Sequence, residues 1–348
     1  MPIENNFADD LELIVPNLHR RYSGVTATNR MVAPKLAKMF RAAWLGSHAP
    51  GGIARIGFAD LLKLWRRREP LIWHARRNDE MIAGVLLRAL GWRLKLVFTS
   101  AAQRHHTWLT RWLIRQMDAV IATSELSASF LKREATVVMH GVDTDSFAPP
   151  QDRAAAFAES GLPGRYAVGC FGRVRAQKGT DVFVEAMCRL LPRYPDFTAV
   201  IVGAVVPEQQ GFADELRQRI AASGLQSRIV ITGELEIEEV RRWYRRLTIY
   251  AFTSRNEGFG LTLIEAMSVG AALVASRAGA AEFVVEDGVT GMLTPPGDVD
   301  ALVAALQPLM QDPASAIEMG VRGRARVLEK FSLDAEANAI AEVYRTLA

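Results

Sequence analysis

The chain has 348 residues, of which 49% are hydrophobic and 23% charged, and its formal net charge is +4. The length suggests two domains of ordinary size, and the composition is typical of a soluble globular protein. No apolar run approaches the roughly 18 residues of a spanning helix. The polar, acidic start MPIENNFADD does not resemble a signal peptide. The two cysteines, Cys170 and Cys188, predict free thiols in a reducing compartment, which favours a cytoplasmic location.

The charge is unevenly distributed along the chain. Residues 1–150 contain 21 lysines and arginines against 13 acidic residues, a balance of +8, whereas the remainder has a balance of −4. A basic half predicts an anionic partner, such as phospholipid headgroups, a phosphorylated lipid or nucleic acid. Scattered, solvated cations would give the same count, so the composition alone leaves this alternative open.

The first half alternates strands, polar loops and helices. Strands are predicted over residues 11–18, 71–75, 93–99 and 119–122. Helices are predicted over residues 30–44, 58–67, 79–90 and 108–117. Gly24 lies at the bend of the first loop, and Thr26 or Thr28 could cap the helix that follows. This alternation predicts βαβ units in a parallel sheet.

Polar residues follow two of these strands. His74, Arg76 and Arg77 lie around the end of strand 71–75, and His105 and His106 follow strand 93–99. The carboxyl ends of parallel strands form the ligand-binding edge of such a sheet. We therefore expect these residues on the side of a binding cleft.

The segment 108–117 predicts an amphipathic helix with cationic flanks. Trp108 and Trp112 lie one turn apart, beside Arg111 and Arg115. Such a helix can lie on a membrane surface, or it can pack its tryptophans on the next strand. The sequence leaves both possibilities open.

The segment 139–150 (MHGVDTDSFAPP) is rich in turn-forming residues and predicts an interdomain linker. It contains Asp143-Thr144-Asp145, a D-x-D triplet of the kind that can hold a divalent metal against a diphosphate. Its place in a turn-rich segment, away from the end of an apolar strand, favours turn capping. We expect no metal site in the chain.

The second half repeats the alternation. Strands are predicted over residues 166–171, 199–203, 228–232, 247–253 and 271–275. Helices are predicted over residues 181–191, 212–223, 238–246, 262–268 and 298–311. Arg173 and Lys178 lie in the loop after the first of these strands, and Gly258-Phe259-Gly260 lies in the loop after strand 247–253.

The glycine loop and its neighbours predict a nucleoside diphosphate site. Gly258 and Gly260 allow close approach of the backbone to a phosphate at a helix N-terminus. Glu265, one turn inside that helix, leans back toward its start, where a carboxylate suits the vicinal diol of a ribose. Glu257, eight positions earlier, lies near the group carried by the distal phosphate. With Arg173 and Lys178 as counter-charges, the chemistry that fits is glycosyl transfer without a metal.

These motifs resemble those of a known family. Gly172-Arg173, Lys178-Gly179, Glu257-Gly258-Phe259-Gly260-Leu261 and Glu265-Ala266-Met267 occur in the order and at the spacing of the retaining GT-B glycosyltransferases with the E-x7-E motif (glycosyl transferases group 1, family 4). The resemblance implies an α/β protein with two Rossmann-like parallel-sheet domains that face each other across a cleft. Residues 1–148 would bind the acceptor and residues 149–330 the nucleotide sugar, and helix 331–348 would pack back on the first domain.

The resemblance also implies roles for individual residues. Arg173 and Lys178 would bind the diphosphate and, with Glu257, act in catalysis, while Glu265 would hold the ribose. The donor's distal phosphate and sugar would contact Gly258, Phe259, Gly260, Leu261 and Thr262. A catalytic histidine of the first domain's cleft would correspond to His105 or His106. The reaction would retain the anomeric configuration through a same-face route and would need no cofactor.

The first half, with PNLHRRYSGVTAT and IWHARRNDEM, is most similar to the lipopolysaccharide core mannosyltransferases of α-proteobacteria. This resemblance implies GDP-mannose as donor, an anionic lipid-linked glycan ending in Kdo as acceptor, contact with the cytoplasmic face of the inner membrane, and no nucleic acid. The candidate acceptor-binding residues are Ser23, Gly24, Arg20, Arg21, His74, Arg76 and Arg77. Three alternatives stay open: a transferase that takes a UDP-hexose to lipopolysaccharide or another glycolipid, a non-catalytic nucleotide-sugar-binding protein, and a two-domain epimerase or phosphorylase.

Overall fold

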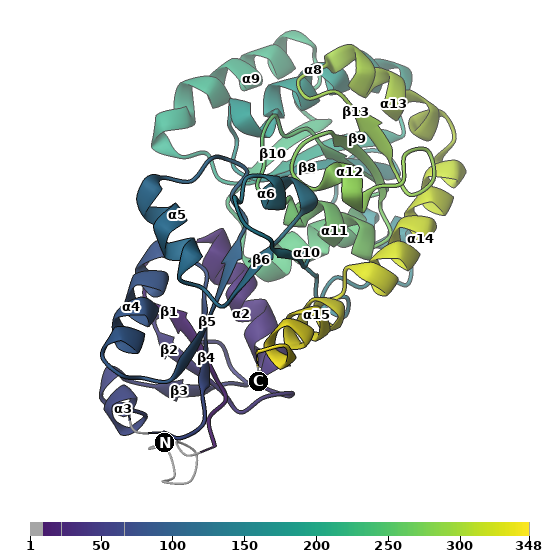
Figure 1. The fold of residues 1–348 in the computed structure, drawn as a ribbon. Coiled ribbons are helices and arrows are strands. Elements are labelled where there is room, and N and C mark those ends of the chain that lie inside the picture. Colours follow the sequence, from purple (N-terminus) through teal and green to yellow (C-terminus); the bar gives the residue numbers. More distant parts are fainter. Residues whose placement is uncertain (1–9, 22, 66, 348) are drawn as a thin grey trace. The chain divides into compact units, whose positions relative to one another are not determined.

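The computed structural model describes residues 10–21, 23–65 and 67–347, which form two compact units (Figure 1). Unit 1 comprises residues 1–141 and 333–348, and unit 2 comprises residues 142–332. The polar start that argued against a signal peptide lies, apart from Asp10, outside the described residues. Within the described ranges, no helix is both long and apolar enough to cross a membrane.

The boundary between the units falls at Gly141, earlier than the residue 148 expected from the sequence. The reason is that the segment after Gly141 is bonded to unit 2. The Ser268 hydroxyl donates to the carbonyl of Phe147 over 2.9 Å, and the Arg245 guanidinium donates to the carbonyl of Ser146 over 3.1 Å. The chain leaves unit 2 beside the point where it enters, because Val142 pairs with Ser332.

Unit 1 is built on seven parallel strands in the order β3-β2-β1-β4-β5-β6-β7. The strand order reverses between β1 and β4, which makes their carboxyl ends the topological switch point of the sheet. The strands are β1 (Leu13–Asn17), β2 (Ala42–Gly46), β3 (Ala54–Ile56), β4 (Leu71–Ala75), β5 (Leu94–Ser100), β6 (Ala119–Ala122) and β7 (Thr136–Val137). The helices are α2 (Gly24–Leu36), α3 (Phe58–Lys63), α4 (Asn78–Ala89), α5 (Trp108–Arg115), α6 (Glu125–Ser129) and α15 (Leu333–Arg345).

Each face of the unit 1 sheet is covered by its own set of helices. On one face, Leu36 of α2 and Ile340 of α15 pack on the strands. On the other, Leu61 of α3, Met81 of α4 and Leu113 of α5 do so. The C-terminal helix therefore packs within unit 1, and helices α3, α4 and α5 share the opposite face (Figure 1).

Unit 2 repeats the design with six parallel strands in the order β10-β9-β8-β11-β12-β13, so that its switch point lies between β8 and β11. The strands are β8 (Tyr166–Phe171), β9 (Phe197–Val202), β10 (Ile229–Gly233), β11 (Ile249–Phe252), β12 (Ala272–Ser276) and β13 (Met292–Thr294). The helices are α7 (Arg153–Ala158), α8 (Thr180–Leu190), α9 (Gln210–Ala222), α10 (Ile237–Arg246), α11 (Leu261–Ser268), α12 (Ala281–Val284), α13 (Val299–Gln311) and α14 (Pro313–Lys330), with 3₁₀ turns at Ala176–Lys178, Leu191–Arg193 and Pro207–Gln209.

The helix predicted over residues 30–44 was wrong in its second half. The helix α2 starts earlier, with Ser23 as its N-cap instead of Thr26 or Thr28, and the last part of the predicted span belongs to β2. Residues 42–45 of β2 are buried on both faces because helices cover both sides of the sheet: Ala42 and Trp44 lie in the core on one side, and Ala43 and Leu45 lie in the core on the other. A strand buried on both faces reads as a continuous apolar run, and such a run resembles a buried helix.

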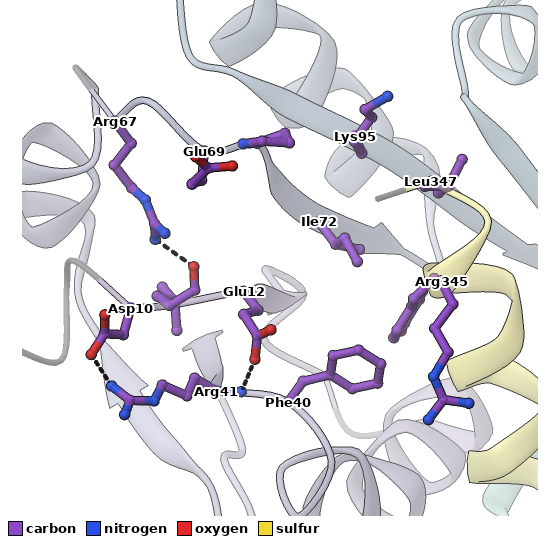
Figure 2. A pocket seen from close by; sticks show the side chains of 13 residues that line it. Asp10, Glu12, Phe40, Arg41, Arg67, Glu69, Ile72, Lys95, Arg345 and Leu347 are labelled. Atoms are coloured by element: carbon purple, nitrogen blue, oxygen red, sulfur yellow. Dashed lines mark hydrogen bonds and ion pairs between the residues drawn. The ribbon is translucent and has the colours of Figure 1, made fainter.

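A cavity of about 700 Å³ opens at the amino edge of the unit 1 sheet (Figure 2). Its walls include Glu12, just before β1, and Arg41, just before β2, together with Lys95 and Tyr344. This edge is opposite to the switch point. The cavity also borders Asp10, the first residue that the structure describes.

Candidate active site

The two loops at the switch point of unit 2 are joined by hydrogen bonds. The Thr253 hydroxyl donates to the carbonyl of Lys178 over 2.9 Å, and the Arg255 N–H donates to the carbonyl of Gln177 over 2.8 Å. Gly179 makes this approach possible, because it has φ 67° and a Cβ on it would lie 1.9 Å from the carbonyl oxygen of Thr253. The loops after β8 and β11 are thus fixed side by side.

Both predicted cations lie at this switch point. Lys178 forms an ion pair with Oε2 of Glu257. The Ser254 hydroxyl donates to the same oxygen over 3.4 Å. Arg173 is exposed and forms no hydrogen bond or ion pair with any residue that the structure describes. The site therefore presents one free guanidinium and one ammonium whose present partner is a half-buried carboxylate.

The glycine loop leads directly into α11. Gly260, with φ 95°, is the N-cap residue, and the loop is held in place because the Ala280 N–H donates to the carbonyl of Phe259 over 2.8 Å. Gly279 is required beside it, since a Cβ there would lie 2.4 Å from the same carbonyl oxygen. The positive end of α11 thus lies at the switch point, a position that favours an anion.

Glu265 lies in α11 with a fixed hydrogen-bond partner. The Tyr244 hydroxyl donates to its carboxylate over 2.7 Å. Burial raises the pKa of Glu265, while the Tyr244 hydroxyl and the charges of Arg241 and Lys178 oppose that rise. Lys178 is therefore close enough to act electrostatically on both glutamates of the motif.

Tyr244 was not predicted from the sequence. It is fully buried at the end of α10, with its ring centroid 4.4 Å from that of Phe171 and 5.4 Å from that of Phe147. The sequence offers only an aromatic residue among the arginines of an amphipathic helix, which is the usual pattern of a core contact.

At the switch point of unit 1, Arg77 is the centre of an internal network. Its guanidinium donates to Asn17 over 2.8 Å and to the hydroxyls of Ser23 and Thr26, each over 2.7 Å. It also pairs with Glu80 at 3.2 Å. Burial raises the pKa of Glu80 to about 7. The hydrogen bond from the Arg76 N–H and the positive charge of Arg77 oppose this rise. Arg77 and Ser23 are thereby committed to holding the loop before α2.

The other predicted acceptor residues fall into two groups. Arg20, Arg21 and Gly24 are exposed at this edge. His74 is buried, and both of its ring nitrogens are occupied, by the Tyr344 hydroxyl at 2.5 Å and the Thr99 hydroxyl at 2.7 Å. Burial lowers the pKa of His74 well below its ordinary value. His74 therefore lies in the core of unit 1 with both ring nitrogens bonded, and its contact with an acceptor stays a prediction.

Arg76 differs from its neighbours because two of its guanidinium nitrogens are buried without a partner among the residues that the structure describes. The residue is 8% exposed, and within the described residues its Nε and Nη2 atoms have no hydrogen bond. A buried charge without a counter-charge is costly. An anion bound at this position would remove that cost.

The two candidate histidines lie in different surroundings. His106 has Nε2 at 3.4 Å from the Ser100 hydroxyl, at the carboxyl end of β5, and burial lowers its pKa. His105 is exposed and packs edge-on against Phe130, with ring centroids 5.3 Å apart. His106 is the one that lies against the end of the strand.

The D-x-D triplet caps a turn. The carboxylate of Asp143 accepts hydrogen bonds from the N–H of Asp145 at 3.2 Å and from the hydroxyl of Ser146 at 2.6 Å. Across the described residues, no group of three or more histidine, cysteine, aspartate and glutamate side chains could hold a metal ion. Cys170 and Cys188 are both free.

The comparisons with known proteins agree on one family. Residues 165–312 match the model of the glycosyl transferases group 1. The chain is 49% identical to the lipopolysaccharide core biosynthesis mannosyltransferase LpcC of Rhizobium leguminosarum bv. viciae over 97% of both chains. It is 43% identical to the lipopolysaccharide core biosynthesis mannosyltransferase LpsB of Rhizobium meliloti (strain 1021), over 97% of this chain and 98% of that one.

The chain belongs to the glycosyl transferases group 1 family. It is a hexosyltransferase, and its two parallel-sheet units have the GT-B fold, as the sequence predicted. The fold is shared with Anabaena HepE, whose crystal structure contains UDP and glucose. The two chains are 20% identical, and they superimpose with a TM-score of 0.79 over 97% of this chain and all of that one. The matched range of the family model contains every predicted donor-binding residue, from Arg173 to Glu265.

Proposed function

We propose that this enzyme transfers mannose from GDP-mannose to the Kdo of the lipopolysaccharide inner core, with retention of anomeric configuration. The observation that carries the proposal is the near full-length likeness to the two rhizobial core mannosyltransferases. The unit 2 switch point supports it, because two cations, a helix N-terminus and two carboxylates suit a nucleoside diphosphate and the hydroxyls on either side of it.

Donor binding would exchange the partners of Lys178. The ammonium would leave Glu257 for the diphosphate, which Arg173 also binds. Glu257, released, would then accept hydrogen bonds from the sugar hydroxyls, near the backbone of Gly258 to Leu261 and the hydroxyl of Thr262. Glu265 would accept from the ribose hydroxyls.

In the transfer step, the bond between the sugar carbon and the diphosphate oxygen breaks while an acceptor hydroxyl attacks from the same face. The acceptor proton passes to the leaving diphosphate, and GDP is released. Arg173, Lys178 and the N-terminus of α11 stabilise the negative charge that develops on the leaving group. We therefore propose that the reaction requires no metal or other cofactor.

The acceptor would be bound by unit 1. Its Kdo carboxylate suits the buried guanidinium of Arg76, which has no partner among the described residues, and His106 lies near the same edge of the sheet. Because this acceptor is linked to a lipid, the enzyme would act as a peripheral protein on the cytoplasmic face of the inner membrane. Nucleic acid is not among its proposed partners.

A donor panel tests the proposal. Purified protein is incubated with a Kdo-bearing inner-core acceptor and GDP-mannose, UDP-glucose or UDP-galactose, with and without EDTA, and thermal stabilisation by GDP and by UDP is measured in parallel. We expect transfer from GDP-mannose, stabilisation by GDP, and no effect of EDTA. Stabilisation by UDP and not by GDP would overturn the choice of donor in favour of a UDP-hexose.

A further inference from the structure

Helices α3, α4 and α5 of unit 1 expose an unusual set of large apolar side chains. Each helix presents them at helical spacing on its outer side. We call this set the apolar face, and it consists of Phe58, Leu62 and Trp65 at α3, Ile82, Leu86 and Leu90 at α4, and Trp108, Leu109 and Trp112 on α5. Trp108 is 74% exposed, Leu62 68% and Leu90 65%.

These helices adjoin one another, so the exposed side chains form one surface and not three isolated sites. The indole N–H of Trp65 donates to the carbonyl of Leu90 over 3.0 Å, which joins the end of α3 to the end of α4. The amide of Asn78 donates to the hydroxyl of Thr110 over 2.8 Å, which joins the start of α4 to α5. The three helices run along the same side of the unit 1 sheet (Figure 1).

The segment that carries Trp108 and Trp112 contains only positive charges. Residues 104–117 contain Arg104, Arg111 and Arg115 and no acidic residue. None of these three arginines forms an ion pair within the described part of the chain, and Arg104 and Arg115 are exposed. Asp60 and Asp118, by contrast, are paired with Lys63 and Arg88. Anionic groups are therefore the complement of this surface.

We propose that the apolar face docks unit 1 on the surface of an anionic lipid bilayer. Tryptophans are the side chains that favour the boundary between headgroups and acyl chains, and unpaired arginines beside them attract anionic headgroups. A helix with apolar residues on its outer side and cations at its edges lies in that boundary and does not cross it.

The placement of α5 links this surface to the proposed acceptor edge. The helix starts at Trp108, immediately after His105 and His106, which follow the carboxyl end of β5. A lipid-linked glycan held by a bilayer at α5 would therefore emerge beside the edge that carries His106. The docking surface deepens the proposed function by naming its membrane contact, but its test needs neither donor nor acceptor.

Vesicle flotation with the full chain tests the proposal. Vesicles of phosphatidylcholine alone are compared with vesicles that also contain phosphatidylglycerol, at low and high salt. The variants are Trp108→Ser with Trp112→Ser, and Arg111→Gln with Arg115→Gln. The matched control is Ile237→Ser with Val321→Ser, two apolar residues of unit 2 that are 55% and 65% exposed.

We expect the protein to bind the anionic vesicles at low salt. The double variant Trp108→Ser with Trp112→Ser should bind at least about tenfold more weakly. The double variant Arg111→Gln with Arg115→Gln should bind about tenfold more weakly and should lose the preference for anionic vesicles. The control should bind like the unchanged protein.

Absence of binding to anionic vesicles, or equal binding to both vesicle types at all salt concentrations, would overturn the proposal. The proposal would also be overturned if the protein self-associates and the double variant Trp108→Ser with Trp112→Ser does not. A second copy of the chain would then be the occupant of the apolar face. Vesicle binding without mannosyl transfer would reject the proposed function alone, and transfer to a lipid-free acceptor without vesicle binding would reject the docking surface alone.

Discussion

The two units have corresponding switch points with different chemistry. In unit 2, the strands β8 and β11 lead to an exposed Arg173, a Lys178 with a replaceable partner and the N-terminus of α11. In unit 1, the strands β1 and β4 lead to Arg77, whose guanidinium is bonded to three elements of its own unit. One parallel-sheet design thus carries accessible cations at the switch point of one unit and a closed polar network at that of the other.

The difference lies in how each site balances its charges. At the switch point of unit 2, Lys178 is paired with a half-buried carboxylate and Arg173 is exposed, so the proposed diphosphate would replace these partners at little cost. In unit 1, Arg77 already has buried partners, and only Arg76 has buried guanidinium atoms that no described residue satisfies. We infer that a ligand of unit 1 would be recognised by Arg76 with exposed neighbours, and that Arg77 sets the shape of the edge.

The largest effect is expected at Lys178. The change Lys178→Ala removes a charge at the leaving diphosphate and should lower kcat by about 100- to 1,000-fold. It also leaves Glu257 without its ion-pair partner beside the incoming phosphates. The measurement is the rate of mannosyl transfer at saturating donor and acceptor.

The control for Lys178 is Arg217→Ala, which removes an exposed cation of α9 whose ion-pair partner is Asp214. It should leave kcat unchanged, because an exposed ion pair of this kind contributes little. Equal activity of the two variants would remove Lys178 from the donor site.

The sequence predicted the site in unit 2 better than the site in unit 1. Arg173, Lys178, Glu257 and Glu265 lie in short segments next to strands, and the strand order brings those segments together whatever the rest of the packing is. Tyr244 escaped prediction because its role depends on a contact with Glu265 across 21 positions. A buried aromatic side chain carries no sign of such a contact in its own segment.

The prediction of unit 1 failed where tertiary contacts decide the outcome. Residues 42–44 of β2 were predicted as the end of a helix, because burial on both faces removes the alternation of a strand. His74 and Arg76 are two positions apart at the end of β4, but only the packing of Tyr344 shows that the first is occupied. Trp108 and Trp112 could have faced the sheet or solvent, and the structure places both outward.

The next effect in size separates Arg76 from Arg77. Arg76→Met removes a charged partner of the acceptor and should raise the acceptor KM by about 10- to 100-fold, with donor hydrolysis unchanged. Arg77→Met instead leaves Glu80 buried without its counter-charge and should lower the free energy of unfolding by about 3 kcal/mol. Kinetics with varied acceptor and urea unfolding of both variants distinguish the two roles.

The opposite pattern, with Arg77→Met changing only the acceptor KM and Arg76→Met only stability, would reverse the assignment. Arg76→Lys sharpens the experiment, because it keeps the positive charge while removing the planar fork that binds a carboxylate through two parallel bonds. Partial recovery of the acceptor KM in this variant would indicate that charge contributes part of the recognition and geometry the rest.

The smallest effect concerns the hydrogen bond between Tyr244 and Glu265. In the proposed donor complex, the ribose hydroxyls donate to Glu265, so binding would need the carboxylate form of this residue. Burial raises the pKa of Glu265, so affinity for GDP should fall with decreasing pH while the pH is still above the range of an ordinary glutamate. The Tyr244 hydroxyl stabilises the carboxylate and so lowers this pKa.

Tyr244→Phe should therefore move the loss of GDP affinity to a higher pH and weaken binding about 3- to 10-fold at neutral pH. Calorimetric titration with GDP across a pH series measures both quantities. Glu265→Gln should bind GDP weakly with no such pH dependence, which identifies Glu265 as the titrating group. An unchanged pH profile in Tyr244→Phe, with its fold intact, would show that the hydroxyl only fills space in the core and that the carboxylate is held in place by other contacts.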